Sequence, residues 1–231
     1  MGRAKRVMPA GMVFHLLNRA HEGGRLFGHD GDFRAFEGLL EESLAWCRER
    51  GKCPVRLYAY CLMPNHWHML ASSEESQGLV SFLQRLTAAH VRRWRKYHGS
   101  PGRGVLYQGR FRSFPVQDDG HFSTVASYIE ANALRSNLVE RAEEWRWGSL
   151  SRRLQLRDTW LSAWPIPRPS HWIKQVNSHL KPGQINGLRT SVQRGRPYGT
   201  EDWCDTVVRD ISLQSTLKNP GRPPVPANNG V

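Results

Sequence analysis

The chain has 231 residues, with 33 Lys and Arg against 20 Asp and Glu, so its formal net charge at pH 7 is +13 and its sequence pI is about 10.3. This excess of positive charge predicts a polyanionic partner. The four cysteines form no C-x-x-C pair, which argues against a zinc ribbon and against a disulfide framework. No signal peptide or membrane-spanning apolar stretch is visible, so we expect a soluble protein, cytoplasmic if the cell is bacterial.

Strands and helices are expected to alternate over the first 155 residues. A strand near Val13–Leu17 precedes a helix from about Asp32 to Gly51, whose apolar residues keep helical spacing. A hairpin follows, then a helix over Leu79–His98, a strand near Val105–Val116 and a helix that contains Tyr128. The order β-α-β-β-α-β-α predicts an α+β fold, ferredoxin-like or RRM-like, with an antiparallel sheet and helices packed on one face.

Two histidines, His66 and His68, lie on the second strand of the expected hairpin, just after the turn signal Pro64-Asn65. Residues two apart on a strand point to the same face with Cα atoms about 6.5 to 7 Å apart, so both imidazoles can share one cation. Trp67 is expected on the other face. Taken alone, the pair is more simply explained by histidines on a half-exposed strand, because a chain with ten histidines forms such pairs by chance.

The segment Asp119–Ala133 has the spacing of an amphipathic helix. Tyr128 and Asn132 are four residues apart, so they stack on one strip of that helix, which Arg135 also joins. A core-boundary tyrosine and a polar helix end would explain the two residues without any function. The expected buried stripe consists of Phe122, Val125, Ala126, Ile129 and Ala133.

These residues together resemble the single-tyrosine HUH transposases, and within that family the REP-associated tyrosine transposases. The family has a His-hydrophobic-His strand and a helical Tyr-Ile-x-x-Asn segment in its catalytic centre, which His66-Trp67-His68 and Tyr128–Asn132 match. Ala133 departs from the pattern, since many relatives have proline there. Further similar stretches occur in order over about residues 7 to 155, namely Phe14–Arg19, Leu106–Ser113, Leu138–Arg141 and Trp145–Trp147.

The resemblance implies that Tyr128 is the nucleophile and that His66, His68 and Asn132 hold a divalent cation, Mg²⁺ or Mn²⁺. Chemistry is consistent with this, because a tyrosine hydroxyl is a weak nucleophile at neutral pH and a cation makes a phosphodiester more electrophilic. Attack would leave a phosphotyrosine ester, close in energy to the bond broken, so that rejoining needs no ATP. The expected function is therefore a DNA transposase that cleaves and rejoins single-stranded hairpin DNA.

Basic side chains are expected to bind the DNA. Residues 76 to 117 contain eight basic residues and no acidic one, on a helix and on the strand that precedes the tyrosine helix. An ordinary solvated helix face explains the helical cluster equally well. The expected DNA-binding residues are Arg92, Arg93, Arg95, Lys96, Arg110, Arg112, Arg135, Arg194 and Arg196.

We expect a catalytic domain at residues 1–158 and a basic C-terminal DNA-binding extension at residues 159–231. Residues 159 to 200 carry six basic side chains and no acid, and the run Trp164–Pro169 must be extended or irregular. This composition suggests a linker or a wrapping arm. Tryptophans here and at the end of the catalytic domain are expected to serve mainly in packing.

Within this extension, Arg194-Gly195-Arg196-Pro197 matches the core of an AT-hook, an extended segment that enters the minor groove of A·T-rich DNA. Pro220–Pro223 is a weaker match to the same motif, because it lacks the first arginine. A short helix is expected from Thr200 towards Ile211, and a helix-turn-helix over residues 200–217 is a weaker alternative. The last 14 residues, 218–231, are expected to be disordered.

Two other functions stay open at this point. A non-catalytic DNA-binding protein derived from a transposase would keep the basic surface without the chemistry, and the four intact site residues count against it. An RNA-binding module could use an exposed aromatic sheet, but no RNP-type consensus is visible. A monomer whose tyrosine and histidines meet in one chain is expected, with a dimer also open, and we expect association with the nucleoid.

Overall fold

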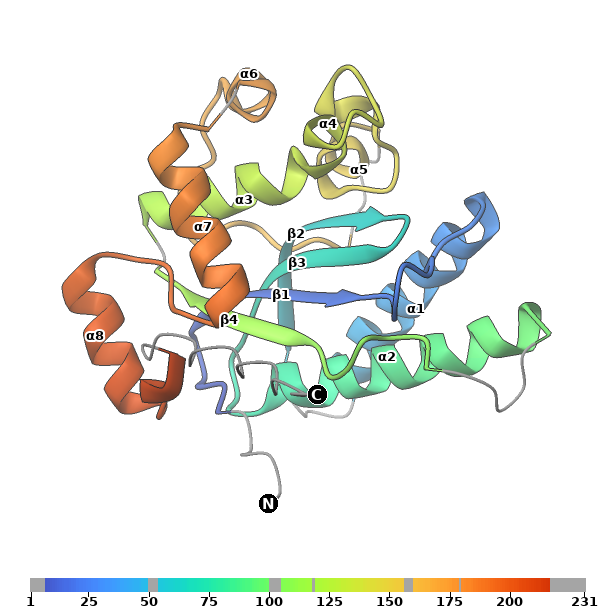
Figure 1. The fold of residues 1–231 in the computed structure, drawn as a ribbon, viewed down its shortest axis with the longest axis horizontal. Coiled ribbons are helices and arrows are strands. Elements are labelled where there is room, and N and C mark those ends of the chain that lie inside the picture. The colour runs from blue at the N-terminus through green and yellow to red at the C-terminus, as the bar shows by residue number, and fades with distance from the viewer. Residues whose placement is uncertain are drawn as a thin grey trace, which may run out of the picture.

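The computed structural model describes residues 7–49, 54–99, 105–117, 119–155, 160–178 and 180–216. Its centre is one antiparallel sheet with the strand order β2-β3-β1-β4. This is the ferredoxin-like arrangement expected from the sequence, so the predicted fold class is confirmed (Figure 1). The strands are β1 (Val13–Arg19), β2 (Val55–Met63), β3 (His66–Ser73) and β4 (Arg112–Val116).

The hairpin β2-β3 fixes the face on which each histidine lies. Its loop contains only Pro64 and Asn65, and Met63 pairs with His66 directly across it. Because side chains alternate along a strand, His68 and Leu70 share one face and Trp67 lies on the other. The predicted alternation is confirmed, since Trp67 belongs to one buried cluster and Leu70 to the cluster on the opposite face.

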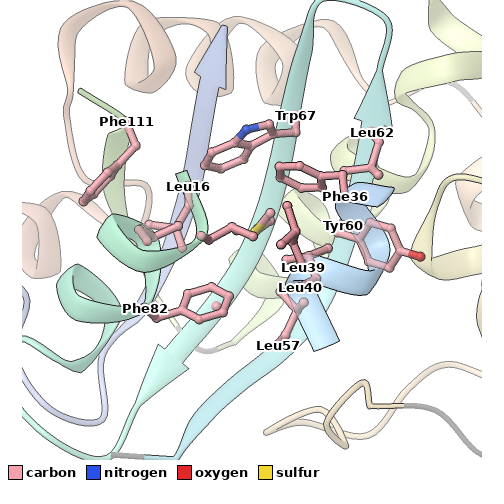
Figure 2. Close-up of a cluster of buried hydrophobic side chains, with 14 of the residues drawn as sticks. Leu16, Phe36, Leu39, Leu40, Leu57, Tyr60, Leu62, Trp67, Phe82 and Phe111 are labelled. Atoms are coloured by element: carbon pink, nitrogen blue, oxygen red, sulfur yellow. The ribbon is translucent and has the colours of Figure 1, made fainter. Parts of the chain in front are cut away.

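Two long helices, α1 (Asp30–Glu49) and α2 (Gly78–Tyr97), cover the face of the sheet that carries Trp67. Asp30 and Asp32 in the first turn of α1 complement its dipole. Figure 2 shows side chains from both helices and from the strands meeting in this core. Trp67, Phe36 and Phe82 are fully buried there, and replacing one of them by alanine would cost about 3–5 kcal/mol of folding free energy.

The expectation of helices on one face holds for α1 and α2 only, because α3 (Gly120–Glu130) and helices that follow it cover the opposite face, across the sheet from α1 and α2 in Figure 1. Asp119 starts α3 because its carboxylate accepts a hydrogen bond of 2.8 Å from the His121 backbone N–H. The expected buried stripe is confirmed, from Phe122 to Ala133. The helix is interrupted at Ala131 and resumes as the short α4 (Asn132–Arg135).

The expected strand over 105–116 is shorter than predicted. Only Arg112–Val116 pairs as β4, whereas Tyr107 makes an isolated bridge to Ala20. Gly109 and the neighbouring residues therefore form an irregular connection. The predicted alternation still holds at its end, because Phe111 is buried while Arg110 and Arg112 are exposed.

The described part of the C-terminal extension packs on α3, as a wrapping arm would. The buried carboxylate of Glu130 in α3 accepts hydrogen bonds of 2.6 Å from Ser149 Oγ and from Trp172 Nε1. The run Trp164–Pro169 is irregular, as expected, and Trp164 packs against Phe122. The remaining elements are η1 (Ala142–Glu144), α5 (Ser149–Gln155), α6 (Trp172–Asn177), α7 (Pro182–Arg194), α8 (Glu201–Asp210) and η2 (Gln214–Thr216).

Several sequence predictions fall outside the described residues. The boundary expected at 158/159, the weak second motif at 220–223 and the whole of the expected disordered tail, 218–231, belong to them. The helix expected after Thr200 is confirmed as α8, without a side-chain cap from that threonine. None of the described helices has the length and apolar character needed to cross a membrane.

Candidate nuclease and DNA-binding site

The candidate catalytic residues line one cleft of about 1400 Å³, which lies on the α3 side of the sheet. His66 and His68 reach it from β3, Tyr128 and Asn132 from the α3-α4 junction, and Arg189 from α7. The structure thus brings together in a single chain the four residues that the sequence analysis selected as catalytic or metal-binding. Ring centroids of His68 and Tyr128 are 6.1 Å apart.

Each cleft histidine has its Nδ1 atom engaged. His66 Nδ1 lies 2.6 Å from Asn65 Oδ1, and His68 Nδ1 lies 2.8 Å from Nε2 of His15 on β1. An amide oxygen only accepts, so His66 donates from Nδ1 and keeps an unprotonated Nε2. His68 can adopt the same tautomer when His15 accepts its proton. This arrangement of an engaged Nδ1 and an available Nε2 is typical of metal-binding histidines.

Burial keeps these imidazoles neutral at neutral pH. It lowers the pKa of His15 to about 3 and the pKa of His66 to about 4, and it holds the pKa of His68 well below its usual value. The positive charge of Arg135 adds to each shift, and Arg19 adds to those of His66 and His68. A neutral imidazole is the form that binds a metal ion, so the protein supplies ligand-competent histidines without any need to lose protons.

Tyr128 is held by Arg135. The guanidinium carbon of Arg135 lies 3.7 Å from the Tyr128 ring centroid, and its Nη1 donates a hydrogen bond of 2.7 Å to the Tyr128 carbonyl oxygen. A charged group over an aromatic face within this distance is a favourable cation–π contact. The short helix α4, which ends at Arg135, places the guanidinium of that residue over the Tyr128 ring. Burial lowers the pKa of the Arg135 guanidinium.

Asn132 lies at the base of the same cleft. Its side chain is buried, and among the described residues its Nδ2 atom has no hydrogen-bond partner. A buried amide without a partner is unusual, since such groups are almost always hydrogen-bonded in native proteins. The Asn132 side chain is suited to metal binding, with its amide oxygen directed to a cation and its amide nitrogen directed to substrate or water. With His66 and His68 it would form a neutral N,N,O set suited to Mn²⁺ or Mg²⁺.

The expected DNA-binding residues separate into three groups: those that line the cleft, the basic cluster of α2, and Arg194 with Arg196 at and after the end of α7. Arg110, Arg112 and Arg135 line the cleft, whose wall also includes Arg19, Arg141 and Arg189. Arg112 also donates hydrogen bonds of 3.0 and 3.4 Å to the carbonyl oxygens of Val192 and Gln193 at the end of α7.

The basic cluster of α2 lies away from this cleft. Arg92 lines a neighbouring apolar groove of about 1000 Å³ between α2 and the 107–111 segment. That groove shares Asn18, Gly109 and Arg110 with the cleft, so the two hollows adjoin. Arg93, Arg95 and Lys96 line neither of them.

The AT-hook interpretation of Arg194–Pro197 is wrong for this structure. Arg194 is the last residue of α7, and Gly195 ends the helix in the left-handed conformation (φ 75°) that a residue without a side chain adopts easily. Arg196 Nε donates a hydrogen bond of 2.9 Å to the Thr216 carbonyl oxygen. The motif is therefore folded as a helix end, not as an extended arm, because α7 packs on α3.

His15 is the site residue that the sequence analysis did not select. It appeared there only within a stretch similar to the family, because nothing in a single sequence shows which β1 residue faces His68. The register of β1 against β3 shows which β1 residue is near His68. Leu17 pairs with His68 and His15 pairs with Leu70, so His15 is a diagonal neighbour of His68 across the two strands.

The sequence comparison gives a family match for part of the chain. Residues 40–132 match the family described as "Transposase IS200 like", a segment that begins within α1 and ends at Asn132. This segment thus resembles the IS200-like transposases, and the resemblance to that family expected from the sequence is confirmed. No curated protein matches the chain.

A solved structure gives the more particular likeness. The chain is similar to the structure of a REP-associated tyrosine transposase bound to a REP hairpin, with a TM-score of 0.52 and 15% sequence identity. The match covers 67% of this chain and 86% of the other. At this identity the comparison shows a shared fold.

Proposed function

We propose that this chain is a single-strand DNA transposase of the REP-associated type, which cleaves and rejoins hairpin DNA through a covalent bond to Tyr128. The observation that carries the proposal is the convergence of Tyr128, Asn132 and two histidines with engaged Nδ1 atoms in one basic cleft. An arginine-lined cleft beside a nucleophile suits a phosphodiester backbone. The similar transposase was solved with a REP hairpin, which supports a hairpin substrate.

In the proposed reaction, Tyr128 Oη forms a new bond to phosphorus while the bond from phosphorus to the leaving oxygen breaks. The tyrosine proton is lost to solvent, and the leaving oxygen takes up a proton as a free hydroxyl. The reverse attack by a hydroxyl on the phosphotyrosine rejoins DNA without another energy source. Arg135 orients the Tyr128 ring throughout by its stacking contact.

His66, His68 and Asn132 would hold a divalent cation. When bound, the ion would withdraw charge from a non-bridging oxygen of the scissile phosphate and orient it. The arginines of the cleft, Arg110 and Arg189 among them, would bind the flanking phosphates. In this proposal the ion serves the chemical step and the arginines serve DNA affinity. Variants of the metal ligands should therefore change the cleavage rate, and variants of the arginines should change DNA affinity.

The decisive experiment is detection of a covalent adduct on a denaturing gel with labelled single-stranded hairpins taken from the chain's own genomic flanks. Reactions would contain Mn²⁺ or a chelator, and the variants would be Tyr128→Phe and, as a control, Tyr97→Phe, which removes a hydroxyl from an exposed residue of α2. We expect a metal-dependent adduct that Tyr128→Phe abolishes and Tyr97→Phe preserves. Tight hairpin binding without any adduct would instead indicate a non-catalytic DNA-binding protein.

A further inference from the structure

A second cluster of potential metal ligands lies away from the cleft, where α1 begins and α2 ends. It consists of His29 just before α1, Asp32 in the first turn of α1, and His98 at the C-cap of α2. One ligand atom from each residue lies within 4.8 Å of the others. The two helices cover the face of the sheet opposite to His66 and His68, so this cluster is separate from the proposed catalytic centre.

The distances within the cluster fit a shared cation better than direct hydrogen bonds. Asp32 Oδ1 lies 3.6 Å from His29 Nε2 and 3.5 Å from His98 Nε2. Hydrogen bonds between such atoms are usually about 2.7–3.2 Å long. Two ligand atoms bound tetrahedrally to zinc at about 2.0–2.2 Å lie about 3.3–3.5 Å apart. Both measured separations are close to that tetrahedral edge.

The surrounding hydrogen bonds orient the same atoms. His98 Nδ1 lies 3.0 Å from the Trp94 carbonyl oxygen, which can only accept, so Nδ1 carries a proton while Nε2 faces Asp32 Oδ1. The Trp94 ring stacks on the imidazole at 4.3 Å between centroids. Asp32 Oδ2 accepts a hydrogen bond of 2.8 Å from the Gly28 backbone N–H, while Oδ1 faces both histidines.

We propose that His29, Asp32 and His98 bind a zinc-class divalent cation that joins the start of α1 to the end of α2. A histidine with one nitrogen bonded to a carbonyl, as at His98, and a carboxylate with its second oxygen hydrogen-bonded, as at Asp32, are typical of metal ligands. Asp32 is 8% exposed and His29 is 69% exposed, so the site opens to solvent at His29, where water would complete the tetrahedron. The competing occupant is a proton that turns the cluster into a histidine–aspartate ion pair.

The test is the zinc content of the full-length protein after equilibration with ZnCl₂ and removal of free metal by gel filtration. The test variant is His29→Gln, which changes an exposed side chain and leaves the packing of α1 intact, and the matched control is His171→Gln, another exposed histidine. Asp32→Asn is a second test variant, because asparagine keeps an acceptor for the Gly28 N–H. Zinc at His66 and His68 does not interfere, since it is present equally in all four proteins.

We expect the wild-type and His171→Gln proteins to retain one more equivalent of zinc than His29→Gln and Asp32→Asn. At a free zinc concentration about 100-fold above Kd, zinc should also raise the Tm of the wild type by about 5–10 °C more than that of His29→Gln. Equal zinc content in wild type and His29→Gln would overturn the proposal. So would a wild-type protein that retains no zinc, in which case the cluster is an ion pair.

Discussion

The Nε2 atom of His15 lies 2.8 Å from the Nδ1 atom of His68, and both side chains are almost completely buried. A histidine in this position would act on the proposed metal site through its neighbour, because it orients the ring of His68 and leaves Nε2 of that ring available. The role requires β1 and β3 to lie side by side, which the antiparallel register provides. His15 is thus a positioning residue for the proposed metal site.

For His15→Ala we expect Mn²⁺ affinity to fall by about 10- to 100-fold, because groups that orient metal ligands typically contribute this much. Electron paramagnetic resonance of free Mn²⁺ measures the affinity directly and does not depend on catalysis. His15→Gln, which keeps a polar partner for His68, should recover part of the loss. An Mn²⁺ affinity equal to wild type in His15→Ala would show that His68 needs no such partner.

Removal of a ligand should be more severe than removal of its support. We expect His66→Ala and His68→Ala each to lower the rate of adduct formation with the hairpin by at least about 100-fold, while hairpin affinity changes little, because the arginines that line the cleft remain. The two rates would be measured at saturating DNA over a range of Mn²⁺ concentrations. Full activity in either variant would exclude the proposed metal site.

Arg135 offers a test of nucleophile positioning. Arg135→Lys keeps the charge but loses the planar group that stacks on Tyr128, so we expect the rate of adduct formation to fall by about tenfold, equivalent to about 1.4 kcal/mol. Hairpin affinity should fall much less. Arg189→Lys is the control, since Arg189 lines the same cleft from α7 and is exposed. Equal rate losses in both variants would mean that Arg135 serves only as a positive charge.

The local pattern of the sequence was enough to predict most of the fold. Strong periodicity located α1, α2, α3 and the hairpin to within a few residues, and the alternation on β3 correctly separated Trp67 from His68. The proposed site depended on more than periodicity. From the sequence, Tyr128 and Asn132 could be assigned to the same site as the histidines only because a known family has the same two motifs in the same order.

Contacts between distant segments account for what the sequence did not predict. His15 needed the β1-β3 register, and the metal cluster needed the ends of two helices that are adjacent only in the folded chain. The AT-hook prediction failed because four residues match a short motif easily, whereas the packing of α7 determines the conformation of Gly195. In each case a long-range contact outweighed local composition.

The buried His90 predicts a specific dependence of stability on pH. It lies on α2 against Phe36 of α1, with Nδ1 2.6 Å from Tyr107 Oη, and burial lowers its pKa to about 3. In the unfolded chain its pKa is about 6.5, so between these two values the unfolded state binds a proton that the folded state does not. The free energy of unfolding should therefore be unaffected by this group above about pH 6.5 and should fall as the pH decreases below it.

For one such histidine the slope approaches about 1.4 kcal/mol per pH unit. Urea unfolding between pH 7.5 and pH 5 should show a shallower decline for His90→Gln than for the wild type, by about this amount per unit at the acidic end. Glutamine does not titrate and can still meet the Tyr107 hydroxyl, whereas His171→Gln, at an exposed position, should keep the wild-type slope. Parallel curves for all three proteins would show that His90 is protonated equally in the folded and unfolded states, contrary to its burial.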